Sequence, residues 1–170
     1  TFLNCGIGGY RNPLGETEYS RVVVKNASYI KRLTAMADIY NANIDVLCAS
    51  PQVKDVLTHA DLNVYNGRIG LLTNTNHTGP TGSYDVSYGN QVINVYGGVI
   101  GGREQSAIRL GYSFYYSGTQ CQLLNDTLNL YGGKLCTGKN NPIILSYDNT
   151  VIKIRHKNNP TKYTTFHTSP

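Results

Sequence analysis

The chain has 170 residues and a formal net charge of +5, and only 15% of its residues are charged. This length suits one domain, or two very small ones, and allows a real hydrophobic core. No apolar run is long enough to span a bilayer, so we expect no membrane insertion. The 14 tyrosines, the 18 glycines and the many asparagines and threonines are typical of a β-rich protein with a hydroxyl- and amide-covered surface.

The first 60 residues predict strands and helices. Apolar residues at 22–24 and 44–48 predict two short strands. Between them, Ser28 suits a helix N-cap, and apolar residues follow at three- and four-residue spacing, which predicts an amphipathic helix over 29–41. Ser50-Pro51 predicts a second, shorter helix that ends near residue 59, because proline suits the first helical position.

Residues 61–170 predict strands alone. Segments 62–69, 93–100 and 128–135 share one pattern, aliphatic-polar-aliphatic-Tyr, a two-residue turn and another aliphatic residue, and 145–152 is a looser copy. Asn-Gly and Gly-Gly adopt positive φ at little cost, so we interpret each copy as a β-hairpin. The expected strands are 62–65, 68–73, 84–88, 91–96, 107–116, 120–124, 128–131, 134–137, 143–147, 150–156 and 162–167.

These elements predict an α+β fold. A small helix-containing N-terminal part, 1–60, precedes an all-β domain, 61–170, or the two form one continuous domain. The all-β part is expected to be a mostly antiparallel barrel or sandwich built from repeated hairpins. A β-trefoil is an alternative, because the three close copies of the pattern begin at 62, 93 and 128.

The four cysteines are widely spaced, which argues against a zinc site. An even number predicts two disulfides, and of the three connectivities we favour the one in which each bridge closes within its own half of the chain. Four unpaired thiols in a cytosolic protein are the alternative. The favoured bridges are Cys5–Cys48 and Cys121–Cys136.

Three N-glycosylation sequons begin at Asn26, Asn76 and Asn125. They favour a secreted, extracellular protein, although a chain rich in Asn and Thr also produces sequons by chance. No cofactor is expected, and the isolated histidines and scattered acids predict no metal site.

One set of side chains suggests catalysis. His77, Glu104, Arg109 and His156 occur in the order His, Glu, Arg, His, which resembles the small secreted fungal guanyl-specific ribonucleases. The resemblance implies RNA transesterification by an acid, a base and a phosphate-binding arginine. The alternative is that these residues lie in loops and on a basic strand edge. Arg155 and His156, being adjacent, face opposite sides of a strand unless a bulge intervenes.

Tyrosines and basic residues suggest binding instead. Tyr115 and Tyr116 are adjacent, so one of them should point outward as a ligand contact, whereas the pre-turn tyrosines Tyr65, Tyr96 and Tyr131 are expected to pack across their hairpins. Residues 151–170 contain no acid, and Arg155 and Lys157 are candidates for contacting an anionic partner, if this run is more than a solvated strand face. Nucleic acid is the less favoured partner, because the segment lacks the density of arginine and aromatic residues that its recognition needs.

The Leu-x-Val-Tyr-x-Gly hairpins and the abundance of Asn, Thr and Gly resemble the effector-like secreted proteins of plant-associated fungi. Some of these join a small helix-containing N-terminal part to a β-barrel. The resemblance covers the overall style of the chain and implies a non-enzymatic virulence factor that engages a host protein or glycan. A small ribonuclease-like hydrolase using His77, Glu104 and His156, and a viral surface glycoprotein domain, are the alternatives.

Overall fold

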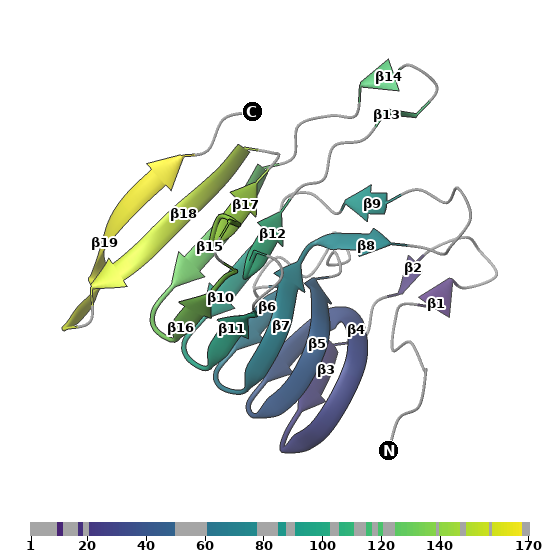
Figure 1. Ribbon diagram of the computed structural model, residues 1–170, viewed down its shortest axis with the longest axis horizontal. Coiled ribbons are helices and arrows are strands. Elements are labelled where there is room, and N and C mark those ends of the chain that lie inside the picture. Colours follow the sequence, from purple (N-terminus) through teal and green to yellow (C-terminus); the bar gives the residue numbers. More distant parts are fainter. Residues whose placement is uncertain are drawn as a thin grey trace.

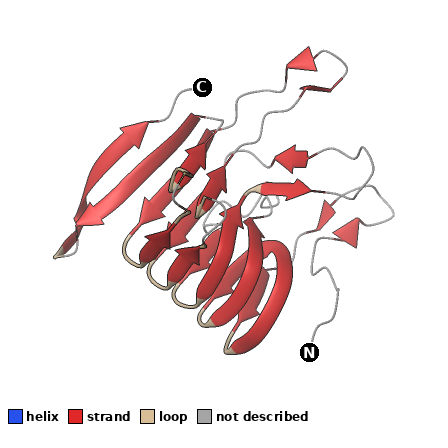
Figure 2. Ribbon diagram, viewed as in Figure 1, coloured by secondary structure: helices blue, strands red, loops and turns tan. Residues whose placement is uncertain are grey.

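The computed structural model describes most of the chain, and every regular element in that part is a strand (Figures 1 and 2). It contains no helix with the length and apolar character needed to cross a membrane. The described residues are 10–11, 17–18, 21–49, 61–77, 85–87, 91–102, 106–110, 115–116, 119–120, 125–138, 140–146, 149–156 and 158–167.

Two runs of parallel strands make up most of one curled 13-stranded sheet, which has the shape of an open half-barrel (Figure 1). We call these two runs the first sheet and the second sheet, and we begin with the first. It contains β3 (Arg21–Val24), the end of β4 (Ala27–Ile39), β6 (Leu62–Val64), β10 (Val92–Val95), β15 (Asn125–Leu130) and β18 (Asn149–His156). The second sheet contains the start of β4, β5 (Ala42–Ala49), β7 (Arg68–Thr73), β11 (Val99–Gly101) and β16 (Lys134–Cys136).

The repeated sequence pattern is one coil of a parallel stack. Within each copy the chain runs along the first sheet, bends, and continues in the second sheet. Leu62 lies beside Ile93 and Ile93 beside Leu128, so equivalent residues of the three close copies pair in parallel. The looser copy at 145–152 is not in this register, because Leu128 pairs with Ile152 and not with Leu145. This is the arrangement of a β-solenoid, in which each repeat contacts only its neighbours.

The predicted α+β fold is therefore wrong. Residues 29–41 were expected to form a helix, but most of them belong to strand β4. Leu33, Ala35, Ala37 and Ile39 are buried at every second position, the period of a strand, so tertiary burial outweighs the helical spacing. The helix expected at 51–59 lies outside the described residues.

The predicted antiparallel barrel or sandwich and the trefoil alternative are wrong for a related reason. The two strands of each copy pair with the next copy instead of with each other, so the two-residue turns are bends between sheets and not hairpin turns. β4 and β6 also pair directly across the boundary that we placed at residue 60.

Glycine occupies the bends of the three close copies, whereas the bends at Asn26 and Asn41 contain none. Gly67 has φ +126° and Gly98 has φ +90°. A Cβ on Gly67 would lie 2.4 Å from the carbonyl oxygen of Ala42, and one on Gly98 would lie 2.8 Å from that of Gly67. Backbone hydrogen bonds continue through the bends, from Tyr65 N to Ile39 O (2.8 Å) and from Tyr96 N to Val64 O (2.7 Å). Each bend therefore packs directly on the one before it.

The space between the two sheets is filled by aliphatic rows. Leu62, Ile93 and Leu128 from the first sheet, and Ile69 and Ile100 from the second, have no solvent exposure. Burial of each such side chain contributes roughly 1.5–3 kcal/mol. The rows run from coil to coil and form one continuous core.

The parallel stack ends in a hairpin. Its pairing shifts between Arg155 and His156, and the chain then returns as β19 (Asn159–His167), antiparallel to β18. We call β18 and β19 the basic hairpin. β12 (Ile108–Leu110) pairs with β17 (Ile144–Ser146) and β7. The remaining pairs are β1 (Tyr10–Arg11) with β2 (Thr17–Glu18), β8 (Thr75–His77) with β9 (Asp85–Ser87), and β13 (Tyr115–Tyr116) with β14 (Thr119–Gln120).

Candidate functional site

The outer face of the first sheet presents two rows of side chains that run across the coils. Along each strand residues alternate, so that Leu62 and Val64 point into the core while Asn63 and Tyr65 point out. Because equivalent residues pair in register, each outward position forms a row. The tyrosine row consists of Tyr40, Tyr65, Tyr96 and Tyr131, and the amide row of Asp38, Asn63, Asn94 and Asn129.

The rings of the tyrosine row stack face to face. Successive ring centroids are 4.6, 4.9 and 4.6 Å apart, with interplanar angles of 8°, 6° and 14°. The ammonium of Lys25 lies 5.3 Å from the centroid of Tyr40, and the guanidinium of Arg155 lies 5.1 Å from that of Tyr131, one at each end of the row. The ring faces are thus used within the protein. A sugar that binds by stacking on an aromatic face would have to displace these contacts.

The amide row is a chain of hydrogen bonds with one direction. Asn63 Nδ2 donates to Asp38 Oδ1 (2.8 Å), Asn94 Nδ2 to Asn63 Oδ1 (2.9 Å), and Asn129 Nδ2 to Asn94 Oδ1 (2.9 Å). At the first end Arg21 forms an ion pair with Asp38, and the contact with Asp38 raises the pKa of Arg21. Hydrogen-bonded chains of this kind strengthen one another and fix the side chains that they join.

Arg155 closes both rows at the other end. Its Nη2 donates to Asn129 Oδ1 (3.1 Å), and its guanidinium also lies 4.3 Å from the ring centroid of Tyr163 in β19. The ammonium of Lys153 lies 5.3 Å from the same ring. Aromatic rings therefore hold two cations in fixed positions on the basic hairpin. From residue 149 to the end of the sequence there is no Asp or Glu.

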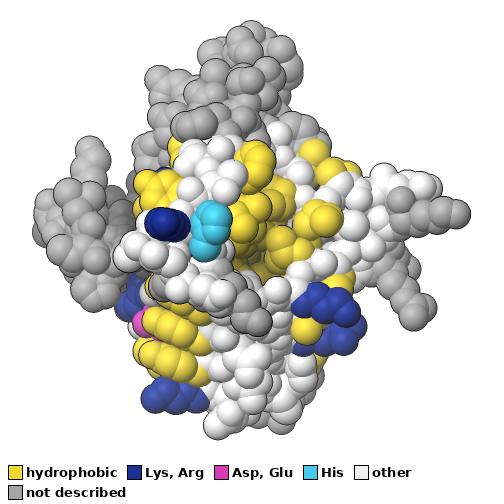
Figure 3. Space-filling view, turned by 90° about the vertical axis from the view of Figure 1, so that its left-hand side faces the viewer, with side chains coloured by type: hydrophobic (Ala, Val, Ile, Leu, Met, Phe, Trp, Pro, Cys, Tyr) yellow, Lys and Arg dark blue, Asp and Glu magenta, His cyan; other side chains and the backbone are white. Residues whose placement is uncertain are grey.

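The opposite face of the basic hairpin carries two exposed apolar side chains beside the buried Ile152. Ile152 pairs with Phe166, and Ile154 lies two residues further along the same face. Ile154 is 44% exposed and Phe166 is 50% exposed. Figure 3 looks onto this end of the stack and shows hydrophobic side chains gathered near its centre, with lysine and arginine side chains toward its margins. Cations and apolar groups thus meet at the end of the molecule.

The structure places the predicted binding residues in two regions. Arg155 belongs to the basic hairpin, as described above, whereas Lys157 lies outside the described residues. Tyr115 and Tyr116 pair with Gln120 and Thr119 in the small β13–β14 sheet, and their side chains are outside the described part of the chain. Tyr65, Tyr96 and Tyr131 stack along the coils instead of packing across hairpins.

The structure describes only part of the alternative catalytic set. His77 is in β8 opposite Asp85, with its side chain undescribed, and Glu104 lies outside the described residues. Arg109 is in β12, between Thr73 and Leu145 of its neighbours, and His156 is exposed at the end of β18. β12 and β18 are not paired with each other. No group of three or more His, Cys, Asp or Glu among the described residues is arranged to hold a metal ion.

The described part of the chain contains one cysteine of each predicted disulfide. Cys48 and Cys136 are free thiols, and Cys5 and Cys121 lie outside the described residues. Cys48 is fully buried between Thr34 and Thr73 of the neighbouring strands, and burial raises the pKa of its thiol to about 12. The thiol is therefore protonated at neutral pH and behaves as a small core side chain rather than as a nucleophile.

Of the predicted glycosylation positions, Asn26 is exposed at the first bend, with φ +53°, and its Oδ1 accepts a hydrogen bond from Asn41 (3.2 Å). Asn76 lies in β8 and Asn125 at the start of β15, with their side chains outside the described part. Use of these sequons stays a prediction.

The sequence reasoning missed the amide row and a buried carboxylate. Each asparagine of the row precedes a tyrosine by two residues in every close copy of the pattern, and this constant offset was the available signal. Asp126 is buried and accepts hydrogen bonds from Asn74 Nδ2 (2.7 Å) and Gln91 N (2.9 Å), which joins segments far apart in the sequence. No local motif indicates that contact.

No similar protein is available for comparison with this geometry. Comparison of the chain with protein-family models, with the curated proteins and with the solved structures finds no match in any of the three.

Proposed function

We propose that this protein is a secreted, non-enzymatic binding protein of the effector type, and that it engages an acidic surface of a host protein through the basic hairpin. The observation that carries the proposal is the fixation of Arg155 by Asn129, Tyr131 and Tyr163. A guanidinium that is already ordered loses less conformational entropy when it binds a carboxylate.

The tyrosine row favours a protein partner over a glycan. Its ring faces are covered by neighbouring rings and by Lys25 and Arg155, so edges and hydroxyl groups are left for contacts. Sugar recognition by tyrosine relies on the apolar ring face, whereas protein interfaces also use the hydroxyl and the edge. Host engagement and secretion follow from the sequons and from the resemblance to effector-like proteins.

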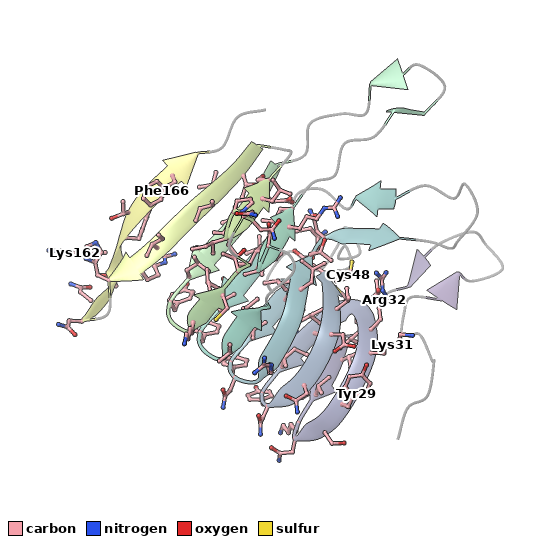
Figure 4. All side chains as sticks on the ribbon, in the orientation of Figure 1. Tyr29, Lys31, Arg32, Cys48, Lys162 and Phe166 are labelled. Carbon is pink, nitrogen blue, oxygen red and sulfur yellow. The ribbon has the colours of Figure 1, made fainter. Side chains whose placement is uncertain are left out.

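Retention of the protein on immobilised poly-glutamate tests the proposal. Arg155→Ala should weaken retention about tenfold, or roughly 1.4 kcal/mol, and added salt should weaken it further. Lys31→Ala is the matched control, because Lys31 is an exposed cation on β4, away from the hairpin (Figure 4). Equal losses in both variants would show that only net charge matters.

A second assay addresses the hydrolase alternative. The protein is incubated with RNA alongside His77→Ala and His156→Ala. The binding proposal expects no cleavage by any of the three proteins. Cleavage that both substitutions abolish would contradict the non-enzymatic assignment.

A further inference from the structure

β19 is the last strand of the sheet, and its outer edge is free in the described structure. It pairs with β18 alone and stands at the end of the hydrogen-bonded order of strands. Residues 161–166 are all exposed, and Figure 4 shows Lys162 and Phe166 on this outermost strand. An edge strand carries unpaired N–H and C=O groups, which form a template for an incoming strand.

The two faces beside this edge differ in chemistry. On one face are Ile154 and Phe166, both well exposed. On the other are Lys153, Arg155 and Tyr163, with the two cations held over the tyrosine ring. Side chains of a strand alternate between faces, so a strand added here would match both faces if aliphatic residues alternate with acidic ones.

A second copy of this chain fits the edge poorly. No acid occurs from residue 149 onward, so pairing two copies of β19 would bring two basic hairpins together, and like charges in adjacent strands are destabilising. Pro160 in β19 also lacks an N–H for pairing. Lysine and proline are residues with which sheet edges resist self-association. The charge of the hairpin instead complements an acidic partner.

We propose that the free edge of β19 binds an extended acidic segment of a partner protein by strand addition. Main-chain hydrogen bonds to β19 hold the segment, Phe166 of β19 contacts its aliphatic residues, and Lys153 and Arg155, one strand further in on β18, attract its carboxylates. The inference rests on the proposed function, because it gives the form of the partner that the basic hairpin engages.

Three synthetic peptides test this mode on the unaltered protein. The first alternates valine with glutamate, the second replaces glutamate with lysine, and the third is the glutamate peptide with alternate backbone nitrogens methylated. The glutamate peptide should bind saturably, and the lysine peptide should not bind. Methylation removes N–H donors but keeps the charge, so it should weaken binding at least about tenfold.

Two matched pairs of variants localise the site. Phe166→Ala should weaken the glutamate peptide about tenfold, whereas Tyr29→Ala, at an aromatic residue 53% exposed on β4, should not. Lys162→Glu should weaken the same peptide, and Lys31→Glu, on β4, should not. A circular dichroism spectrum for each variant confirms that it retains its strands.

The outcomes separate the mode of binding from the proposed function. If the methylated peptide binds as tightly as its parent while Arg155→Ala still weakens retention on poly-glutamate, strand addition is wrong and the binding function stands. If neither probe depends on the hairpin, both fail. A concentration-dependent dimer that Phe166→Ala abolishes would assign the edge to a second copy and overturn the acidic partner.

Discussion

The middle coils and the terminal hairpin carry the same alternation of aliphatic and polar residues, but they differ in what covers them. Val64 and Val95 have no solvent exposure, whereas Ile154, which continues their row through Leu130, is 44% exposed. The difference comes from the neighbours and not from the residue types. A middle strand has a coil on both sides, while β18 is followed by a single antiparallel strand.

The sequence departs from the repeated pattern where the stack ends. In the middle coils a glycine with positive φ follows the tyrosine position, and the chain turns into the second sheet. At the end of β18, Arg155 takes the tyrosine position and no glycine follows. The register shifts after Arg155, and the chain folds back on itself. The residue after which the register shifts is thus also the cation that closes both rows.

The largest expected effect concerns contact between coils. A Cβ on Gly101, which has φ +99°, would lie 1.9 Å from the carbonyl oxygen of Cys136 in the next coil. Gly101→Ala should therefore lower the free energy of unfolding by about 3 kcal/mol, from backbone strain and overpacking together. A Cβ on the neighbouring Gly102 would meet no atom within 4 Å. Gly102→Ala should therefore change the free energy of unfolding by less than about 0.5 kcal/mol. Denaturant unfolding of both variants measures this, and equal effects would refute close packing of the coils.

The next prediction compares the covered core with the uncovered end. Leu128 is fully buried, so Leu128→Ala should cost about 2–5 kcal/mol of unfolding free energy. Phe166 is 50% exposed, and Phe166→Ala should cost less than about 1 kcal/mol, because much of its surface is already in water. The same unfolding measurement applies. A large loss from Phe166→Ala would mean that the terminal hairpin is as well packed as the middle coils.

A smaller effect is expected in the amide row. Asn94→Ala removes the donor to Asn63 and the acceptor of Asn129 in the part-buried row. It should lower the free energy of unfolding, measured with denaturant, by about 1–2 kcal/mol. Asn43 makes one exposed hydrogen bond to Ser28 O, so Asn43→Ala is the control and should cost less than about 0.5 kcal/mol. Identical losses would show that the row adds no stability beyond isolated hydrogen bonds.

The smallest effect is a dependence on alkaline pH. Burial, followed by neighbouring tyrosines, raises the pKa of Tyr65 and Tyr96 above the ordinary value of 10.0. The folded state then holds protons that the unfolded state has lost. Stability from these groups is complete below about pH 10 and is lost as the pH rises through the raised pKa values. Tyrosinate absorbance gives the pKa values, and Tyr65→Phe with Tyr96→Phe should reduce the alkaline loss of stability.

Much of the local structure was predictable, because strand signals are local. The expected strands at 62–65, 68–73 and 91–96 contain β6, β7 and β10. Their partners were not predictable from the turn alone, since positive φ at Asn-Gly and Gly-Gly serves a hairpin and a coil bend equally well. The recurrence at 62, 93 and 128 carried the missing information, because repeats of this length are typical of stacked coils.

The site was predictable only in part. The basic character of 151–170 made Arg155 a predicted binding residue, since charge is visible in the sequence, and that role stays a prediction. Its partners Asn129 and Tyr131 come from the preceding coil, and stacking alone brings them together. An even count of cysteines predicts bridges but says nothing of burial, and Cys48 is a free thiol enclosed within the second sheet.

The amide row gives the outer face of the first sheet a net dipole along the stack. Every Nδ2 group points toward Asp38 and every accepting oxygen toward Arg155, so the amide dipoles add like the peptide dipoles of a helix. A carboxylate stands at the positive end and a guanidinium at the negative end. If one amide group were rotated by 180°, its Nδ2 would face another N–H donor of the row. The amides can therefore change orientation only together. The charges at the two ends of the row select one of two orientations for three amides, in three coils, at once.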